Sequence, residues 1–392
     1  MKPKSLEIID IFLSKVKTYL NTQSDSFDRL EVNNGLGGLI LFNRLISNDS
    51  EKDLTEQYLE KCLELISNSL NQPYLAYDIL EFLMLIDELN NRFDMRIDAD
   101  ELKDQLYEIC LDKFQQDLRL GNFDPLAGFI KFGYYTLYAG ANSRKKSPFD
   151  IERIVDAIQE TAIIDENNSL YWESKLFADK RIYLGSTHGM SGVLNFLLCL
   201  KSSGFAVNNY KYLCKGIISN LFSNVLLNQR HNFPIKLNEI RAEDNVPLNW
   251  CYGDLNVLLP ILRYAITESD FKAIKKAHLM IDQCLDRIEN YEGIFGTNVC
   301  YGKAGVIWQL RSLQKIYTNP KIDHIVRKFS IDIISDINEE LPFFGFTPPF
   351  NGSLRSTSLS FMNGLIGIAL TLKFEKEKTY DPFMNKYLLL LE

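Results

Sequence analysis

The sequence predicts an all-α protein of the α/α toroid class, a closed double ring of seven outer and seven inner helices. Three observations support this fold class. Charged amphipathic segments recur about every 45 to 60 residues, which is the spacing of a helical repeat. Each is followed by a more apolar segment with few charges, and most of the apolar segments are preceded by a glycine-bearing turn. Together they indicate seven repeats of one helix pair.

The charged segments have apolar residues at helical spacing on one face, as expected for helices that cover a core. Each of these helices should therefore expose its other face to water. We expect the seven outer helices to begin near Leu6, Glu51, Asp98, Phe149, Asn209, Glu268 and Lys321.

The apolar segments carry so few charges that most of their surface should be shielded from water. They form the second helix of each pair. We expect the seven inner helices at about residues 38–46, 74–89, 125–137, 190–201, 254–267, 303–317 and 365–372. The stretch 343–349 is interpreted as a loop, and strand signals are sparse.

The turns before the inner helices hold the residues with the most distinctive chemistry. The fullest example is the stretch 185–192, in which His188 lies among glycines just before an apolar helix. We expect such a turn to hold the imidazole at the mouth of a cavity, with free backbone amides beside it. The turn at 73–77 has lost its glycines. All these residues precede the N-terminal ends of inner helices, which favours a closed ring with one central site over an open solenoid.

Composition places the chain among ordinary globular proteins of one large domain, residues 1–392. Hydrophobic residues make up 46% and charged residues 24% of the 392 positions, and no linker-like or low-complexity run divides them. The net charge of -8 argues against nucleic acid or an anionic membrane as the main partner. A cationic peptide suits this charge better. No stretch of about 18 apolar residues occurs, so we expect no membrane span.

The cysteines and the N-terminal segment indicate a cytoplasmic protein. Seven cysteines are an odd number, and most fall inside helical patterns, as expected for reduced thiols. The N-terminal segment is amphipathic and lacks the continuous apolar core of a signal peptide.

Two cysteines occupy equivalent places in successive repeats. Cys251 and Cys300 each lie two residues before the glycine of an inner-helix turn. Because a helix N-terminus lowers the pKa of a thiol, two thiolates could meet there and hold zinc. The alternative is that both are buried structural thiols, since cysteine is among the most frequently buried residues.

Four further residues are candidates for proton transfer. His188 could handle protons or simply cap its helix. Asp124 precedes an inner helix and could be its N-cap. Tyr252 and Tyr301 follow the two cysteines and could be proton donors or packing residues.

Four ordered motifs together resemble the lanthionine synthetase C family, the lanthipeptide cyclases. The motifs are Gly185-x-x-His188-Gly189-x-x-Gly192, Trp250-Cys251-Tyr252-Gly253, Cys300-x-Gly302-x-Ala304-Gly305 and Phe361-Met362-Asn363-Gly364-x-x-Gly367. The resemblance covers nearly the whole chain and implies an α/α toroid with a central zinc ion. It also implies a reaction in which cysteine thiols of a dehydrated precursor peptide add to dehydroalanine or dehydrobutyrine, forming (methyl)lanthionine thioether rings.

The resemblance also implies roles for individual residues. Cys251 and Cys300 match the zinc-binding cysteines, and His188 matches the histidine that handles protons at the enolate stage. Tyr252 matches the tyrosine after the first metal cysteine, and Asp124 matches the active-site aspartate. The implied partner is a precursor peptide with a leader and a cysteine-bearing core, and a dehydratase and an exporter are further partners of such a system.

Two positions depart from the family pattern. Tyr301 stands where the family usually has the histidine that is the third zinc ligand, and Pro247 stands where an arginine is common. Arg230, His231 and Arg241 in the preceding loop could compensate for that arginine.

The departures motivate an alternative function, a metal-free peptide-binding scaffold in a lanthipeptide biosynthesis complex. Another α/α-toroid enzyme, such as a glycosidase or a terpene cyclase relative, would need paired carboxylates near the central turns. Asp124 and Asp254 are the chief acidic residues there.

Overall fold

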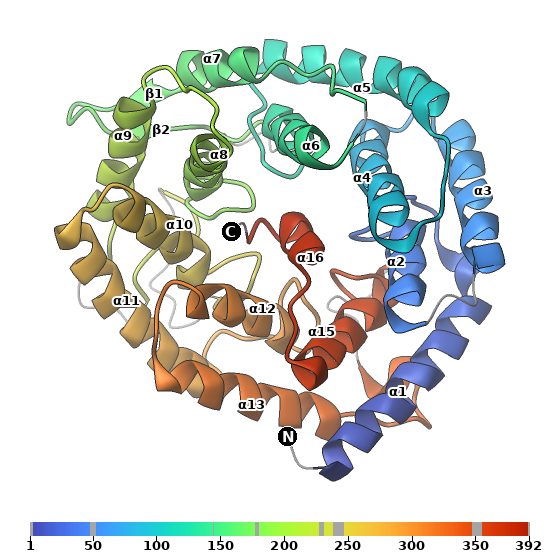
Figure 1. The fold of residues 1–392 in the computed structure, drawn as a ribbon. Coiled ribbons are helices and arrows are strands. Elements are labelled where there is room, and N and C mark those ends of the chain that lie inside the picture. The colour runs from blue at the N-terminus through green and yellow to red at the C-terminus, as the bar shows by residue number, and fades with distance from the viewer. Residues whose placement is uncertain are drawn as a thin grey trace. The chain divides into compact units, whose positions relative to one another are not determined.

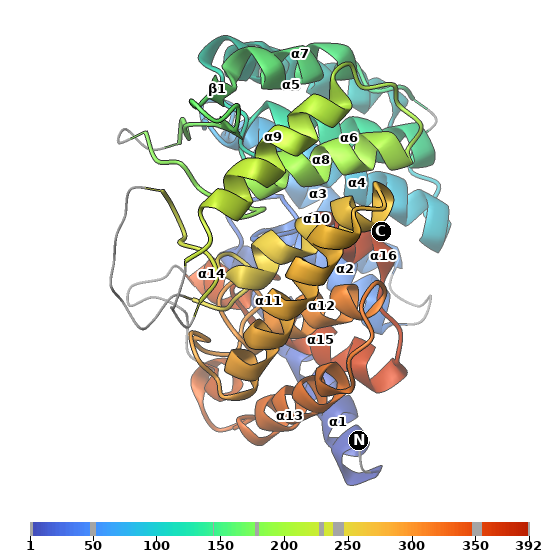
Figure 2. The same cartoon turned by 90° about the vertical axis from the view of Figure 1, so that its left-hand side faces the viewer.

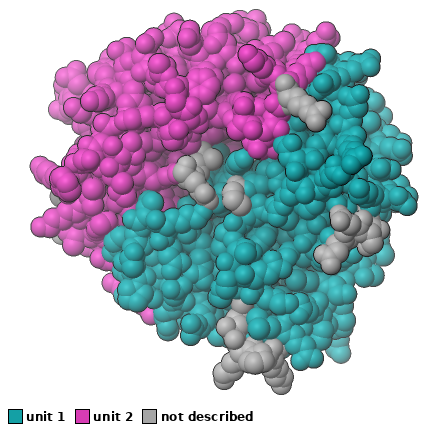
Figure 3. All heavy atoms as spheres, viewed as in Figure 1, with its two compact units in different colours: residues 1–106, 295–390 teal, residues 107–294, 391–392 magenta. Residues whose placement is uncertain are grey.

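The computed structural model describes residues 3–47, 52–143, 145–176, 180–226, 231–237, 247–346 and 355–390. The chain divides into two compact units, which Figure 3 colours separately. Unit 1 contains residues 1–106 and 295–390, and unit 2 contains residues 107–294 and 391–392. The prediction of one domain over 1–392 stays a prediction.

Unit 1 contains four of the seven predicted second helices and the charged helices that pack on them. Within it α2 packs on α4, and α15 packs on both α2 and α12 (Figure 1). Its helices are α1 (Pro3–Thr22), α2 (Leu36–Ile46), α3 (Lys52–Asn68), α4 (Leu75–Phe93), the start of α5 (Asp100–Leu120), α12 (Lys303–Gln314), α13 (Pro320–Ser335), α14 (Arg355–Leu359), α15 (Leu365–Glu377) and α16 (Pro382–Tyr387).

Unit 2 contains the other three second helices, with α8 packed between α6 and α10. Figure 2 shows α9 lying alongside α8 and α11 alongside α10. Its elements after α5 are α6 (Phe129–Asn142), α7 (Ile151–Thr161), β1 (Ile163–Ile164), β2 (Leu170–Tyr171), α8 (Met190–Ser202), α9 (Tyr210–Ser223), α10 (Asp254–Thr267) and α11 (Phe271–Glu289). All seven predicted helix pairs are therefore present in the described residues.

Burial distinguishes the apolar second helices from the charged first helices, as their charge patterns predict. In α8, residues 190–200 are buried without interruption. In α11, by contrast, the buried residues follow helical spacing and leave an exposed face that includes Phe271 and Leu279. A helix buried on all sides needs apolar neighbours on all sides. The second helices therefore form the core of each unit.

Three smaller features complete the comparison with the sequence. β1 and β2 pair in antiparallel fashion, with Ile163 opposite Tyr171. A short 3-10 helix, Pro342–Gly345, begins one residue before the stretch 343–349 that the sequence predicts as a loop and covers its first three residues, and residues 347–349 lie outside the described residues. Across the residues that the structure describes, no helix has the length and apolar character needed to cross a membrane.

Candidate active site

The turns before α2, α6, α8 and α12 share one backbone arrangement. The first residue of the helix donates its amide to the carbonyl seven residues earlier, as in Met190 to Tyr183 (3.1 Å) and Phe129 to Asn122 (2.8 Å). Ser191 donates likewise to Leu184. The first amides of a helix have no partner within the helix, so the turn itself satisfies them. The amides of Met190 and Ser191 are therefore bonded, and the expectation of free amides beside His188 is wrong for these two residues.

The glycine before each helix fits this arrangement because the chain folds back closely on it. A Cβ at Gly189 would overlap the carbonyl oxygen of Tyr183, and a Cβ at Gly128 would overlap that of Asn122. These glycines are thus required for the close approach of the backbone.

A polar side chain four residues before the glycine holds the turn in four repeats. Its oxygen accepts a hydrogen bond from the amide of the residue just before the glycine. The four residues are Asp124 (2.8 Å), Asn249 (2.8 Å), Asn298 (2.7 Å) and Ser360 (3.2 Å). The interpretation of Asp124 as the N-cap of the helix is wrong, because the N-cap of α6 is Gly128 and no side chain caps it. Asp124 instead holds the turn before the helix, where its Oδ1 also accepts from the amide of Leu126.

Asp124 has a second contact that the other caps lack. Its Oδ2 lies 2.8 Å from Nδ1 of His188, in the turn before α8. Asp124 is 2% exposed, whereas the side chain of His188 is 20% exposed. A carboxylate fixed by two backbone amides therefore orients an imidazole that solvent can reach.

Cys251 lies on the other side of His188. Its thiol forms a hydrogen bond with the imidazole, and its carbonyl accepts one from Oγ1 of Thr187 (2.8 Å). Cys251 is 5% exposed. Within unit 2, Asp124, His188 and Cys251 thus form one connected group from three successive turns.

This group sets the protonation of His188. Burial would lower the pKa of the imidazole, but the charge and hydrogen bond of Asp124, followed by the contact with Cys251, outweigh it. The pKa of His188 is therefore raised well above its usual value. The shift favours the imidazolium form, which can donate a proton.

Tyr252 lies beside a small cavity next to this group. The ring of Tyr183 has its centroid 6.5 Å from that of Tyr252 and 6.3 Å from that of His188. The cavity is lined by Gly185, Phe233, Pro234, Ile235, Tyr252, Gly253 and Val257.

Cys300 and Tyr301 belong to unit 1, where they occupy the turn before α12. Cys300 is 8% exposed, and its amide donates to the carbonyl of Met362 (2.8 Å). Met362 in turn donates to the carbonyl of Asn33 (2.9 Å). The turns before α12, α15 and α2 are thus linked by their backbones.

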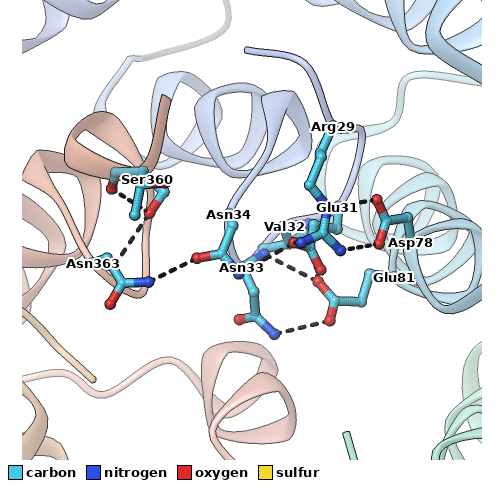
Figure 4. Close-up of polar contacts among 10 residues, drawn as sticks. Arg29, Glu31, Val32, Asn33, Asn34, Asp78, Glu81, Ser360 and Asn363 are labelled. Atoms are coloured by element: carbon cyan, nitrogen blue, oxygen red, sulfur yellow. Dashed lines mark hydrogen bonds and ion pairs between the residues drawn. The ribbon is translucent and has the colours of Figure 1, made fainter. Parts of the chain in front are cut away.

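The carboxylate of Glu81, in α4, binds the turn before α2 (Figure 4). Its carboxylate accepts from the amides of Val32 and Asn33, both at 3.0 Å, and from Nδ2 of Asn33 at 2.8 Å. Asn363 donates from Nδ2 to Asn34 across the same region (3.0 Å). Glu81 takes part in a buried network that supports the Cys300 turn at a distance.

The structure also describes Asp254 and His231, which the sequence analysis noted near the central turns. Asp254 accepts from the amides of Asn232 and Phe233 and from Arg287, so it anchors a loop and is not paired with Asp124. His231 is buried. Arg230 and Arg241 lie outside the described residues.

Sequence reasoning missed two residues of this site, Thr187 and Asn256. Asn256 lies in the first turn of α10 and bonds both to Ser186 and to Trp250. One signal could have identified it. Other second helices have glycine at their third position, namely Gly38, Gly192, Gly305 and Gly367, where α10 has Asn256.

Comparison with known proteins identifies the family. A family model described as "Lanthionine synthetase C-like protein" matches residues 2–385. The chain belongs to this lanthionine synthetase C-like family. A solved structure titled "Nisin cyclase" is similar over 96% of both chains, with a TM-score of 0.71 and 17% sequence identity. That likeness confirms the all-α toroid fold class. No curated protein matches the sequence.

Zinc is the metal that the family resemblance implies. The two thiols suit it, since thiolate sulfur is a preferred zinc ligand, and Tyr301 adds a neutral phenol at the third-ligand position. Among the described residues, no group of three or more His, Cys, Asp and Glu side chains is arranged as a metal site. Cys251 and Cys300 are the zinc ligands that the family resemblance implies.

Proposed function

We propose that the protein is a lanthipeptide cyclase that adds cysteine thiols of a dehydrated precursor peptide to dehydroalanine or dehydrobutyrine. The observation that carries the proposal is the connected group of Asp124, His188 and Cys251 in a member of the lanthionine synthetase C-like family. It combines a fixed carboxylate, a proton donor and a thiol.

The reaction needs a proton moved from sulfur to carbon. The thiol loses its proton, its sulfur bonds to the β-carbon of the alkene, and negative charge develops on the carbonyl oxygen. A proton is then added to the α-carbon, so the mass of the peptide is unchanged. Delivery of this proton by a positioned acid contributes about 10²–10⁴-fold to such rates.

His188 is the acid that we assign to this step. Its raised pKa favours the protonated ring, Asp124 holds its Nδ1 side, and the thiol of Cys251 contacts the same imidazole. Tyr252 lines the cavity, and the role that we assign to it is to donate a hydrogen bond to the developing negative charge.

Cys251 and Cys300 would hold the zinc ion. When bound, zinc lowers the pKa of a thiol that joins it and so supplies a nucleophile at neutral pH. The contribution of this chain is to present two cysteines in the turns that precede α10 and α12.

The test is incubation with a dehydrated, cysteine-bearing precursor peptide that keeps its leader. We expect the free-thiol count of the peptide to fall while its mass stays constant. A constant thiol count with the wild-type protein, in the presence of zinc, would remove the catalytic proposal.

Tyr301 motivates a second candidate, a metal-free scaffold that binds the peptide for other enzymes of the pathway. A phenol is a poor zinc ligand unless it is deprotonated. About one zinc per chain in protein purified without chelator would count strongly against the scaffold.

A further inference from the structure

Asn256 is bonded to two turns at once. Its Oδ1 accepts from the amide of Ser186, and its carbonyl accepts from Oγ of the same serine. Its Nδ2 donates to the carbonyl of Trp250 at 2.7 Å. All three residues are buried, so these bonds are shielded from water.

The two turns that Asn256 joins are the turns of His188 and Cys251. Ser186 lies two residues before His188, and Trp250 lies directly before Cys251. Thr187 adds one more bond between the same turns through its contact with the Cys251 carbonyl. The Asn256 side chain bonds directly to both of these turns.

The turn of His188 also lacks a cap of its own. The position four residues before its glycine is Gly185, where four other turns have an aspartate, asparagine or serine side chain. Asn256 fills this space, and a Cβ at Gly185 would overlap its Oδ1. Gly185 and Asn256 therefore fit each other as a pair.

We propose that Asn256 is a positioning residue that fixes the proton donor His188 relative to the thiol of Cys251. This inference rests on the proposed cyclase function. The Asn256 side chain makes the turn of one repeat depend on the turn of the next. Misplacing a catalytic group by about 1 Å can cost about 10²-fold in rate, so loss of this link should lower kcat more than it raises KM.

Three variants separate this role from a local structural one. Asn256→Gly removes the two side-chain bonds and keeps the backbone carbonyl that accepts from Oγ of Ser186. Asn256→Asp keeps an acceptor for the Ser186 amide but loses the donor to the Trp250 carbonyl. The double variant Gly185→Asn with Asn256→Gly gives the His188 turn the kind of cap that Asn249 and Asn298 give theirs, without restoring the link.

We expect Asn256→Gly to lower kcat about 10- to 100-fold, with KM within a factor of about three. Asn256→Asp should give a similar loss of kcat. The double variant should recover the thermal stability lost in Asn256→Gly but not the kcat. Recovery of kcat together with stability would overturn the proposal, because it would show that capping one turn is sufficient.

Hydrogen exchange tests the link without any activity. Peptides that cover residues 183–190 and 249–253 should both exchange faster in Asn256→Gly, whereas a peptide that covers 122–128 should be unchanged. In the double variant only the second of these segments should remain fast. Unchanged exchange in Asn256→Gly would overturn the link. If the wild-type protein forms no thioether, the cyclase proposal and the role in catalysis fail, while exchange still decides whether the link exists.

Discussion

Nδ1 of His188 lies 2.8 Å from Oδ2 of Asp124, while the other oxygen of the same carboxylate holds two amides of its own turn. The carboxylate thus has no rotational freedom left. Its two functions, the cap and the orientation of an imidazole, can be separated by substitution.

Asp124→Asn should keep the cap and lose the charge that favours the imidazolium. We expect kcat to fall about 10- to 100-fold with little change in thermal stability, because a neutral amide oxygen still accepts from the turn. Asp124→Ala should lose the cap as well and cost about 0.5–2 kcal/mol in the free energy of unfolding. Equal activity of Asp124→Asn and wild type would refute the orienting role.

His188→Ala should remove the proton donor and leave the metal in place. We expect kcat to fall about 10²–10⁴-fold, with unchanged zinc content by elemental analysis. His324→Ala, at an exposed position of α13, is the matched control and should behave as wild type. An unchanged rate for His188→Ala would reduce the residue to a structural role.

Cys251→Ala and Cys300→Ala should each abolish zinc binding, because each removes one of the two thiolate ligands that the chain offers. Cys62→Ala, in a buried cysteine of α3, is the control and should retain the metal. Zinc content measured after removal of loosely bound metal checks the prediction. Retention of full zinc by either of the first two variants would contradict the assigned ligand pair.

Tyr301→His should strengthen zinc binding, since imidazole nitrogen is a preferred ligand and phenol is not. We expect the chelator concentration that removes half of the metal to rise at least about tenfold, which corresponds to about 1.4 kcal/mol. Tyr301→Phe serves as the comparison and should not strengthen binding. If both variants retain zinc equally, the third-ligand position is assigned wrongly.

Glu81→Gln should destabilise unit 1 without touching the residues assigned to chemistry. Glu81 accepts three hydrogen bonds in a buried site, and the glutamine amide cannot replace both oxygens as acceptors. The expected loss is about 2 kcal/mol in the free energy of unfolding, measured by denaturant titration. Glu56→Gln, exposed in α3, should lose far less.

The fold was predictable because charged amphipathic segments and apolar segments alternate along the sequence. A segment without charges such as 190–200 indicates a helix shielded from water on most sides, and the glycine turns mark where most of these helices begin. The second pair, which lacks glycine before α4, was still found by its apolar run.

The site was predictable only in part. His188, Asp124 and Cys251 were identified because their residue types are rare and chemically distinctive. Asn256 was not, because an asparagine inside an apolar helix has no distinctive pattern until its distant partners Ser186 and Trp250 are known. The free amides expected beside His188 were wrong because the backbone seven residues earlier accepts from them.

The backbone bonds that span seven residues have a further consequence. In the turns before α6 and α12, the bond that spans seven residues and one capping side chain hold the backbone, so the residue just before the glycine, Ala127 or Tyr301, contributes its amide to the turn and not its side chain. The Cys251 and Cys300 turns end in the same Cys-Tyr-Gly sequence and both use the amide before the glycine in this way. We therefore expect a departure such as Tyr301 to change the chemistry of its turn without changing the backbone that carries it.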